Sequence, residues 1–249
     1  MKKYVIVLVL TYITSSNVYS QSIYGEVHYS KELVNKSKSK ANENINSYLS
    51  NKDYELKNIF EELNYILRFR DFESAFFVEN LNFEVEENRY YRLALLLGGG
   101  GGSWYLDLKQ NVRLREVEAF GQEFIIKNTI DDLNWNMHNE TKKIGNYLCY
   151  KATTIYVVKN SKGTFNHPVE AWYTSEIPIG FGPIGYGGLP GLIVELSVQN
   201  IKYSISKVVL NPKKQVTIKK PSKGKVVSEE EFNAIGKEAM GNFRSKNSN

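Results

Sequence analysis

Histidine and cysteine, which often ligate metals or act as nucleophiles, are few in this chain of 249 residues. The three histidines are His28, His138 and His167, and no two of them form an H-x-H pair or lie four residues apart. Two zinc ligands on one strand or one helical turn need such a spacing. We therefore expect no metal centre and no other cofactor, and we interpret the histidines as surface or hydrogen-bonded side chains.

Cys149 is the one cysteine, so an internal disulfide is excluded. A hydrolase could pair its thiol with His138 or His167. However, Cys149 lies in the apolar segment Gly145–Val158, where a thiol is buried and unreactive. No spacing that requires acid–base catalysis is present among the carboxylates Asp131, Asp132, Glu170, Glu176 and Glu195. We expect a protein that is not an enzyme, and a hydrolase that uses Cys149 or a carboxylate remains the alternative.

A glycine-rich segment, Ala171–Leu196, holds six glycines and three prolines between apolar side chains. One interpretation is a ligand site, because glycine N–H groups can converge on a ligand oxygen. The interpretation that we favour is structural: glycine and proline conformations hold a tight, buried crossover between parts of a sheet. If the segment binds a ligand, the candidate residues are Trp172, Phe181, Tyr186, Gly187 and Gly188.

Five consecutive glycines, Gly98–Gly102, stand before S-W-Y-L-D-L. A phosphate-binding loop needs a helix directly after it, with a lysine or the helix N-terminus aimed at the anion. The residues that follow are typical of a strand instead, and no G-K-[ST] is present. We interpret this run as a flexible loop.

Positive charge is concentrated between Lys202 and Lys225, where eight lysines occur without an acidic residue. An anionic partner, such as a membrane surface or lipopolysaccharide, is one interpretation. We favour a lysine-protected edge strand followed by a solvated tail. The net charge of the whole chain is only +5, which includes Lys2 and Lys3, and does not indicate a nucleic-acid partner.

The N-terminus resembles a secretory leader, with Lys2 and Lys3 before the apolar run Tyr4–Ile13 and a cleavage site at Val18–Ser20. The apolar run is far shorter than the roughly 20 residues of a membrane span. No cysteine follows the predicted cut, which argues against a lipid anchor. We predict a signal peptide over residues 1–20, one domain over 21–249, export to the periplasm or cell envelope, and no membrane-spanning segment.

Aromatic residues make up 13% of the chain and favour a β-rich protein. Alternating and β-branched patterns predict ten strands: Ser22–His28, Tyr65–Arg70, Ser74–Glu79, Trp104–Leu106, Asn111–Ala119, Phe120–Ile126, Gly145–Val158, Thr164–Thr174, Leu192–Val198 and Lys202–Leu210. One helix is predicted to end near Asn64 and another to span Glu229–Phe243 after the capping box Ser228-x-x-Glu231. Leu81–Leu97 fits either a helix or a strand. The predicted fold class is mainly β (α+β): a strongly curved antiparallel sheet or open barrel with an early and a C-terminal helix.

Gly188–Ile193 spells G-L-P-G-L-I, the motif that names the GLPGLI family of Bacteroidetes. The preceding A-W-Y-T, E-I-P, G-P and Y-G also resemble that family, and so do Trp135, Ile144-Gly145, Cys149-x-Lys151-Ala152 and Glu73-Ser74. The resemblance extends from about Tyr65 to the final helix. It implies a small exported envelope protein, often encoded near outer-membrane receptors, and it implies no activity, substrate or catalytic residue.

Together these features predict a non-catalytic accessory protein of the cell envelope. We expect it to bind a peptide, lipid or protein partner in the concavity of the sheet. The protein partner would be an outer-membrane receptor or another envelope protein. Besides the hydrolase, a purely structural assembly factor remains an alternative, which would expose an apolar patch and lack a pocket.

Overall fold

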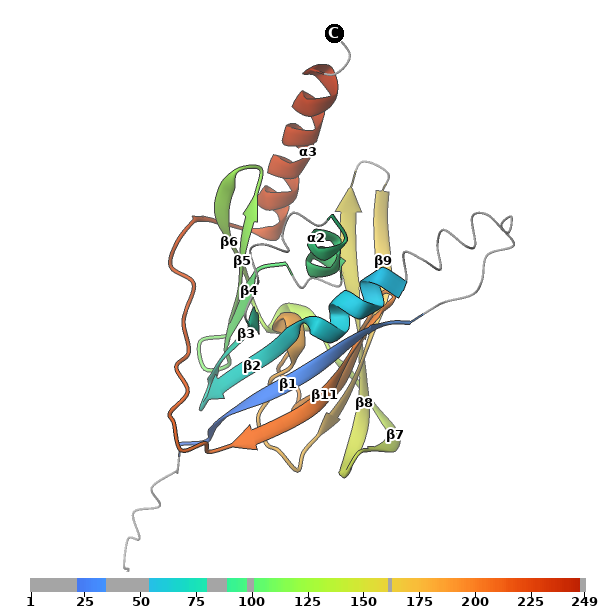
Figure 1. Ribbon diagram of the computed structural model, residues 1–249, viewed down its shortest axis with the longest axis vertical. Coiled ribbons are helices and arrows are strands. Elements are labelled where there is room, and N and C mark those ends of the chain that lie inside the picture. Colours follow the sequence, from blue (N-terminus) through green and yellow to red (C-terminus); the bar gives the residue numbers. More distant parts are fainter. Residues whose placement is uncertain (1–21, 35–53, 80–88, 98–100, 161–162, 247–249) are drawn as a thin grey trace, which may run out of the picture.

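The computed structural model describes residues 22–34, 54–79, 89–97, 101–160 and 163–246. The predicted leader, Gly98–Gly100 and the first part of Leu81–Leu97 lie outside these residues. Within them, the chain forms a sheet of twelve strands in the order β12-β6-β5-β4-β3-β2-β1-β11-β10-β9-β8-β7 (Figure 1). The strands are β1 Tyr24–Leu33, β2 Asn64–Arg70, β3 Glu73–Glu79, β4 Ser103–Asp107, β5 Val112–Ala119, β6 Gln122–Asn128, β7 Asn136–Ile144, β8 Tyr147–Asn160, β9 Gly163–Thr174, β10 Leu192–Val198, β11 Ile201–Leu210 and β12 Lys225–Val227.

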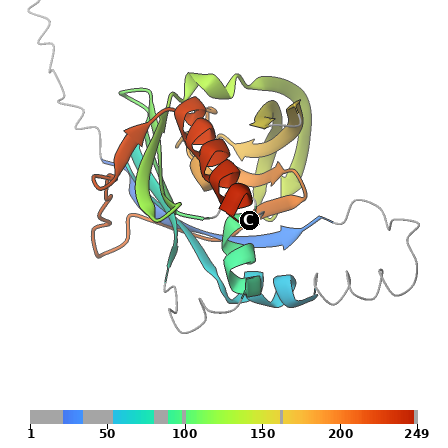
Figure 2. The same ribbon diagram turned by 90° about the horizontal axis from the view of Figure 1, so that it is seen from above.

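The sheet is strongly curved and open, as predicted, because its edge strands β12 and β7 do not pair with each other. Neighbouring strands are antiparallel except β12 and β6, which are parallel. Figure 2 shows the sheet curving round an interior, so that β5 and β6 face β8 and β9 across it. Helices are few: one over residues 54–62, α2 Arg89–Leu96 and α3 Glu229–Lys246. None of the described helices is long and apolar enough to span a membrane.

The main core lies on the concave face of the sheet, and β2 shows how the sequence places it there. Tyr65, Leu67 and Phe69 are fully buried in this core. Arg68, on the opposite face, bonds through Nε to Glu26 and through Nη2 to Glu79, each at 2.8 Å. This alternation is the one that the sequence predicts, although Ile66 on the opposite face is also fully buried.

The glycine-rich segment packs into the concave face between β9 and β10. Its buried apolar side chains, which belong to the main core, are Ile177, Ile179, Phe181, Ile184, Tyr186 and Leu189. At Gly185, with a φ of +74°, an added Cβ would lie 2.2 Å from Cε3 of Trp104 on β4. The backbone N–H of Gly188 donates to the carbonyl of Gly180 at 2.9 Å. The prediction that this segment is ordered and packed is therefore confirmed.

The C-terminal helix α3 lies over one end of the curved sheet (Figures 1 and 2). The predicted capping box is formed: the Glu231 N–H donates to Ser228 Oγ at 3.1 Å, and the Ser228 N–H donates to Glu231 Oε2 at 2.7 Å. Phe232 packs edge-on against Phe124 of β6, with ring centroids 5.4 Å apart. Since α3 contacts both β6 and β8, it bridges the two sides of the open sheet.

The prediction that Lys202–Leu210 is an edge strand is wrong. β11 pairs with β1 on one side and β10 on the other, so it lies near the middle of the sheet. Its lysines are tolerated because they alternate toward the outer face, where Lys202 Nζ lies 2.5 Å from Glu32 Oε1. The edge strands are instead β12 and β7, and the sequence analysis predicted neither. β7 was missed because its residues, N-M-H-N-E-T-K-K-I, lack apolar alternation.

Candidate functional site

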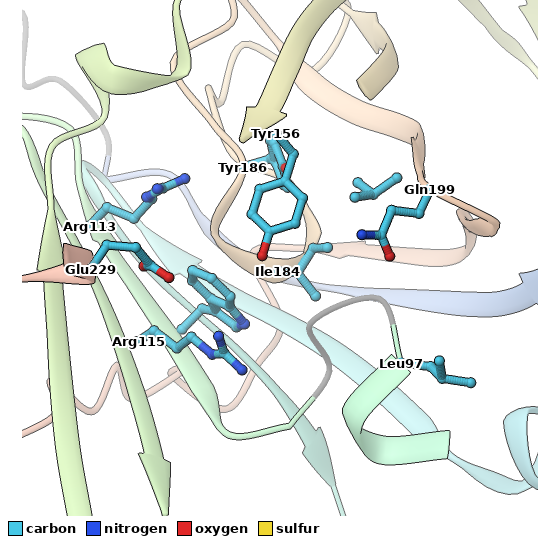
Figure 3. Close-up of a pocket in the computed structure, with 10 residues that line it drawn as sticks. Leu97, Arg113, Arg115, Tyr156, Ile184, Tyr186, Gln199 and Glu229 are labelled. Carbon is cyan, nitrogen blue, oxygen red and sulfur yellow. The ribbon is translucent and has the colours of Figure 1, made fainter. Parts of the chain in front are cut away.

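A cavity of about 250 Å³ lies between the two facing sides of the sheet (Figure 3). Seven parts of the chain line it: the end of α2, strands β4, β5 and β8, the glycine-rich segment, the β10–β11 turn and the start of α3. These parts are far apart in sequence, so curvature of the sheet assembles the cavity. The lining residues are Leu97, Trp104, Arg113, Arg115, Tyr156, Ile184, Tyr186, Val198, Gln199 and Glu229.

Two arginines form the basic wall of the cavity. Arg113 and Arg115 are separated by one residue on β5, so both point to the same face of the strand. Their guanidinium carbons lie 5.9 and 5.3 Å from the centroid of the Trp104 ring. Such cation–π contacts orient the guanidiniums without neutralising them.

Neither arginine has a carboxylate partner within 4.0 Å among the described residues. Their Nε atoms are buried and have no hydrogen-bond partner there, and Arg115 Nη2 reaches only the Gly101 carbonyl at 3.5 Å. Burial lowers the pKa of Arg113, because its charged form is poorly solvated. The basic wall therefore has unused capacity to donate hydrogen bonds to an anion.

Across the cavity, Tyr156 and Gln199 lie opposite the two arginines, whereas Glu229 lies on the arginine side (Figure 3). Burial raises the pKa of both the Tyr156 and Tyr186 hydroxyls, so both remain neutral hydrogen-bonding groups at physiological pH. The cavity thus combines two cations and one carboxylate with neutral polar groups and apolar surface.

Of the five candidate residues from the sequence, Tyr186 lines this cavity. Its ring lies 6.0 Å from that of Trp135, whose Nε1 donates to the carbonyl of Gly187 at 2.8 Å. Phe181 is fully buried beside Phe69. The glycine backbone bonds within its own segment instead of opening toward a ligand, as for Gly188, which supports the structural interpretation.

The structure does not bring Trp172 to the other four candidates. It lies on the outer face of β9, in a small cluster with Cys149 and Val194. Its Nε1 donates to Glu170 at 2.8 Å, and Lys142 Nζ lies 4.3 Å from its ring centroid. Trp172 therefore belongs to a small buried cluster that is separate from the cavity.

The thiol of Cys149 is fully buried, as predicted. Burial raises its pKa to about 11. His138 bonds to Thr153 at 2.7 Å, and His167 packs near Tyr156. The Cys149 thiol donates instead to the carbonyl of Tyr147 at 3.7 Å. Within the described part of the chain, no three His, Cys, Asp or Glu residues are placed to hold a metal ion.

The sequence analysis missed Arg113, Arg115 and Tyr156 as site residues. The pattern R-L-R in a predicted strand does place both arginines on one face, and this was the available signal. No local sequence pattern indicates that this face of β5 points across the interior toward β8. That relation depends on how the sheet curves.

The fold and cavity define a class: an open, curved β-sheet protein with a small internal site. The model of a family described as protein of unknown function (Porph_ging) matches residues 135–167 and 161–195, a stretch that contains the G-L-P-G-L-I motif. No curated protein matches the chain.

Among solved structures, the chain is similar to PNGF-II in two crystal forms, at 13% identity with TM-scores of 0.49 and 0.47. These alignments cover 86% and 87% of this chain but 32% and 33% of PNGF-II, so the chain spans about a third of that protein's length. The lipoprotein LppX of Mycobacterium tuberculosis aligns at 12% identity with a TM-score of 0.26, over 78% of this chain and 89% of LppX.

Proposed function

We propose that the protein is an exported, non-catalytic accessory protein of the cell envelope that binds a ligand in the cavity between β5 and β8. The observation that carries this proposal is the cavity itself, which has on one wall two guanidiniums whose Nε atoms lack hydrogen-bond partners among the described residues, and neutral aromatic groups facing them. A small concave site with apolar lining and a few convergent polar groups is typical of ligand binding.

Export is supported by the leader-like N-terminus and by the resemblance to envelope proteins. The ligand could come from a peptide or lipid, or be presented by a protein partner such as an outer-membrane receptor. The non-catalytic assignment is supported by the burial of Cys149 and its raised pKa, which disfavour a thiolate nucleophile. No catalytic constellation is recognisable among the residues that line the cavity.

Native mass spectrometry on the protein purified from the envelope fraction tests this proposal. Expression of the full chain with its own N-terminus should place the protein in that fraction or in the periplasm, with a cleaved leader. A mass increment that disappears on unfolding identifies a bound ligand.

A cavity-filling variant and a matched control make the test specific. Leu97→Trp fills the cavity from the end of α2, whereas Phe72→Trp places the same indole side chain at the exposed β2–β3 turn. The mass increment should be lost in Leu97→Trp and retained in Phe72→Trp. An increment that survives in both folded variants places the ligand elsewhere and contradicts the proposal, as does the absence of any increment.

A further inference from the structure

The described residues that line the cavity include two guanidiniums and one carboxylate, that of Glu229. Arg113 and Arg115 keep buried Nε atoms without hydrogen-bond partners, although a buried charged donor left unpaired costs stability. A folded protein tolerates such a cost mainly where function requires it. The excess positive charge therefore indicates that an anion completes the site.

We propose that the cavity binds a carboxylate that carries a small apolar or aromatic group, with Arg113 and Arg115 as its anion-binding residues. This inference rests on the proposed function, in which the cavity is the ligand site. A guanidinium presents parallel N–H groups in a planar fork that matches the two oxygens of a carboxylate. With Glu229 beside the arginines, one negative charge on the ligand balances the site better than the double charge of a phosphate.

The rest of the lining indicates what is attached to the carboxylate. Leu97, Ile184 and Val198 contribute aliphatic surface, and the Trp104 ring lies against both guanidiniums. The volume of 250 Å³ corresponds to about eight water molecules at roughly 30 Å³ each. This space suits a group the size of one amino acid. A free small acid and the C-terminal residue of a peptide both supply this chemistry.

Isothermal titration calorimetry with matched probes tests the charge requirement. The first pair is 3-phenylpropionate and 3-phenylpropanamide, which differ only in the carboxylate. The second pair is acetyl-Gly-Gly-Phe with a free or an amidated C-terminus, which distinguishes a peptide source from a free acid. Inorganic phosphate is the third probe. Each acid should bind at least tenfold more tightly than its amide and more tightly than phosphate.

Variants of the basic wall test the assignment of residues. Arg113→Met and Arg115→Met keep the aliphatic stem but remove the charge, and each should weaken binding of the acid probe by about 10- to 100-fold. Arg70→Met is the matched control, since Arg70 stacks on Tyr24 outside the cavity, and it should bind as the unchanged protein does. Circular dichroism confirms that each variant is folded.

The outcomes separate this inference from the proposed function. Binding of 3-phenylpropionate alone supports the inference and identifies a free acid as the source. Binding of acetyl-Gly-Gly-Phe with a free C-terminus supports it and identifies a peptide C-terminus. Equal binding of acid and amide, stronger binding of phosphate, or no effect of either arginine substitution overturns it. If no probe binds at millimolar concentration, the inference is also overturned, whereas a copurifying neutral ligand lost in Leu97→Trp still supports the proposed function.

Discussion

Lys31 is almost fully buried beneath aromatic rings and has no carboxylate partner among the described ion pairs. Its Nζ donates to the carbonyls of Ala94 and Leu97, at 2.9 and 2.6 Å, and so caps the C-terminal end of α2. It also lies 4.6 Å from the centroid of the Phe60 ring. Burial lowers the pKa of this amine to about 7.

This shift predicts that stability rises with pH. Above pH 7 the folded state loses the Lys31 proton, whereas the unfolded chain keeps it up to pH 10.5. The unfolded state then binds more protons, so the free energy of unfolding increases between these values. From pH 7 to pH 9 we expect a gain of about 2 kcal/mol relative to Lys31→Met, measured by urea unfolding of both proteins. If the free energy of unfolding depends on pH equally in both proteins, the amine stays charged in the folded state.

The partly buried charge of Arg113 leads to a prediction about the ligand-free protein. Arg113→Met removes a partly buried cation whose Nε has no hydrogen-bond partner among the described residues, and keeps the stem, so the free energy of unfolding should rise by about 1 kcal/mol or more. Arg70→Met, outside the cavity, should change it by no more than about 0.5 kcal/mol. Denaturant unfolding without ligand measures both. A clear loss of stability in Arg113→Met would mean that this guanidinium is structural.

The thiol of Cys149 provides a test of the hydrolase alternative. At pH 8 its raised pKa, about 11 against an ordinary 9.0, reduces the thiolate fraction by about 100-fold. Labelling by a thiol-specific disulfide reagent should therefore be at least that much slower in the native protein than in urea. Rapid labelling of the folded protein would favour a reactive cysteine.

At the scale of elements, the glycine-rich segment joins the two sides of the molecule. It leaves the sheet after β9, packs against β3, β4 and β5, and returns as β10. The same segment places Ile184 and Tyr186 at the floor of the cavity. The close packing of its glycines against neighbouring strands therefore helps to set the shape of the cavity.

Gly185→Ala tests this role. The new Cβ would meet Trp104 at 2.2 Å in a left-handed conformation, so we expect a loss of about 2–4 kcal/mol in stability. Gly145→Ala is the control: its φ is +56°, but nothing lies within 4 Å of the added Cβ, and it should cost about 1 kcal/mol. Chemical unfolding of both variants measures these losses of stability. Equal losses would indicate that conformation alone, and not packing against Trp104, constrains Gly185.

At the scale of the whole molecule, the order of strands separates a central region from a peripheral one. β1 lies between β2 and β11, and the Tyr29 hydroxyl donates to the carbonyl of Ile193 at 2.6 Å. In contrast, β12 and α3 pack on a small separate cluster around Phe124.

This arrangement predicts different results for two truncations. Removal of residues 225–249 should leave the sheet folded, with a native-like far-ultraviolet circular dichroism spectrum and a cooperative urea transition. Removal of residues 1–34 should abolish folding, because it takes out a strand that pairs on both sides. An unfolded C-terminal truncation would show that α3 belongs to the main cooperative unit.

Local patterns in the sequence were sufficient for the β2–β3 hairpin, the capping box of α3 and the burial of the glycine-rich segment. Each depends on neighbours a few residues apart: the alternation of Tyr65, Leu67 and Phe69, or the spacing of Ser228 and Glu231. The same alternation separates Trp172 from Tyr173, but it does not say which of the two faces the interior. Strand β11 shows the limit of such local patterns, since lysines are compatible with either an edge strand or the solvated outer face of a central strand.

The sequence by itself determined that this is a curved, mainly β protein with a packed glycine-rich crossover and a buried thiol. Only the tertiary structure decided that Arg113 and Arg115 face Tyr156 across a cavity. The physical reason is that a strand's pattern specifies which side chains share a face. Which faces meet depends on the curvature of the sheet and on pairings between residues far apart in the chain, such as β1 with β11.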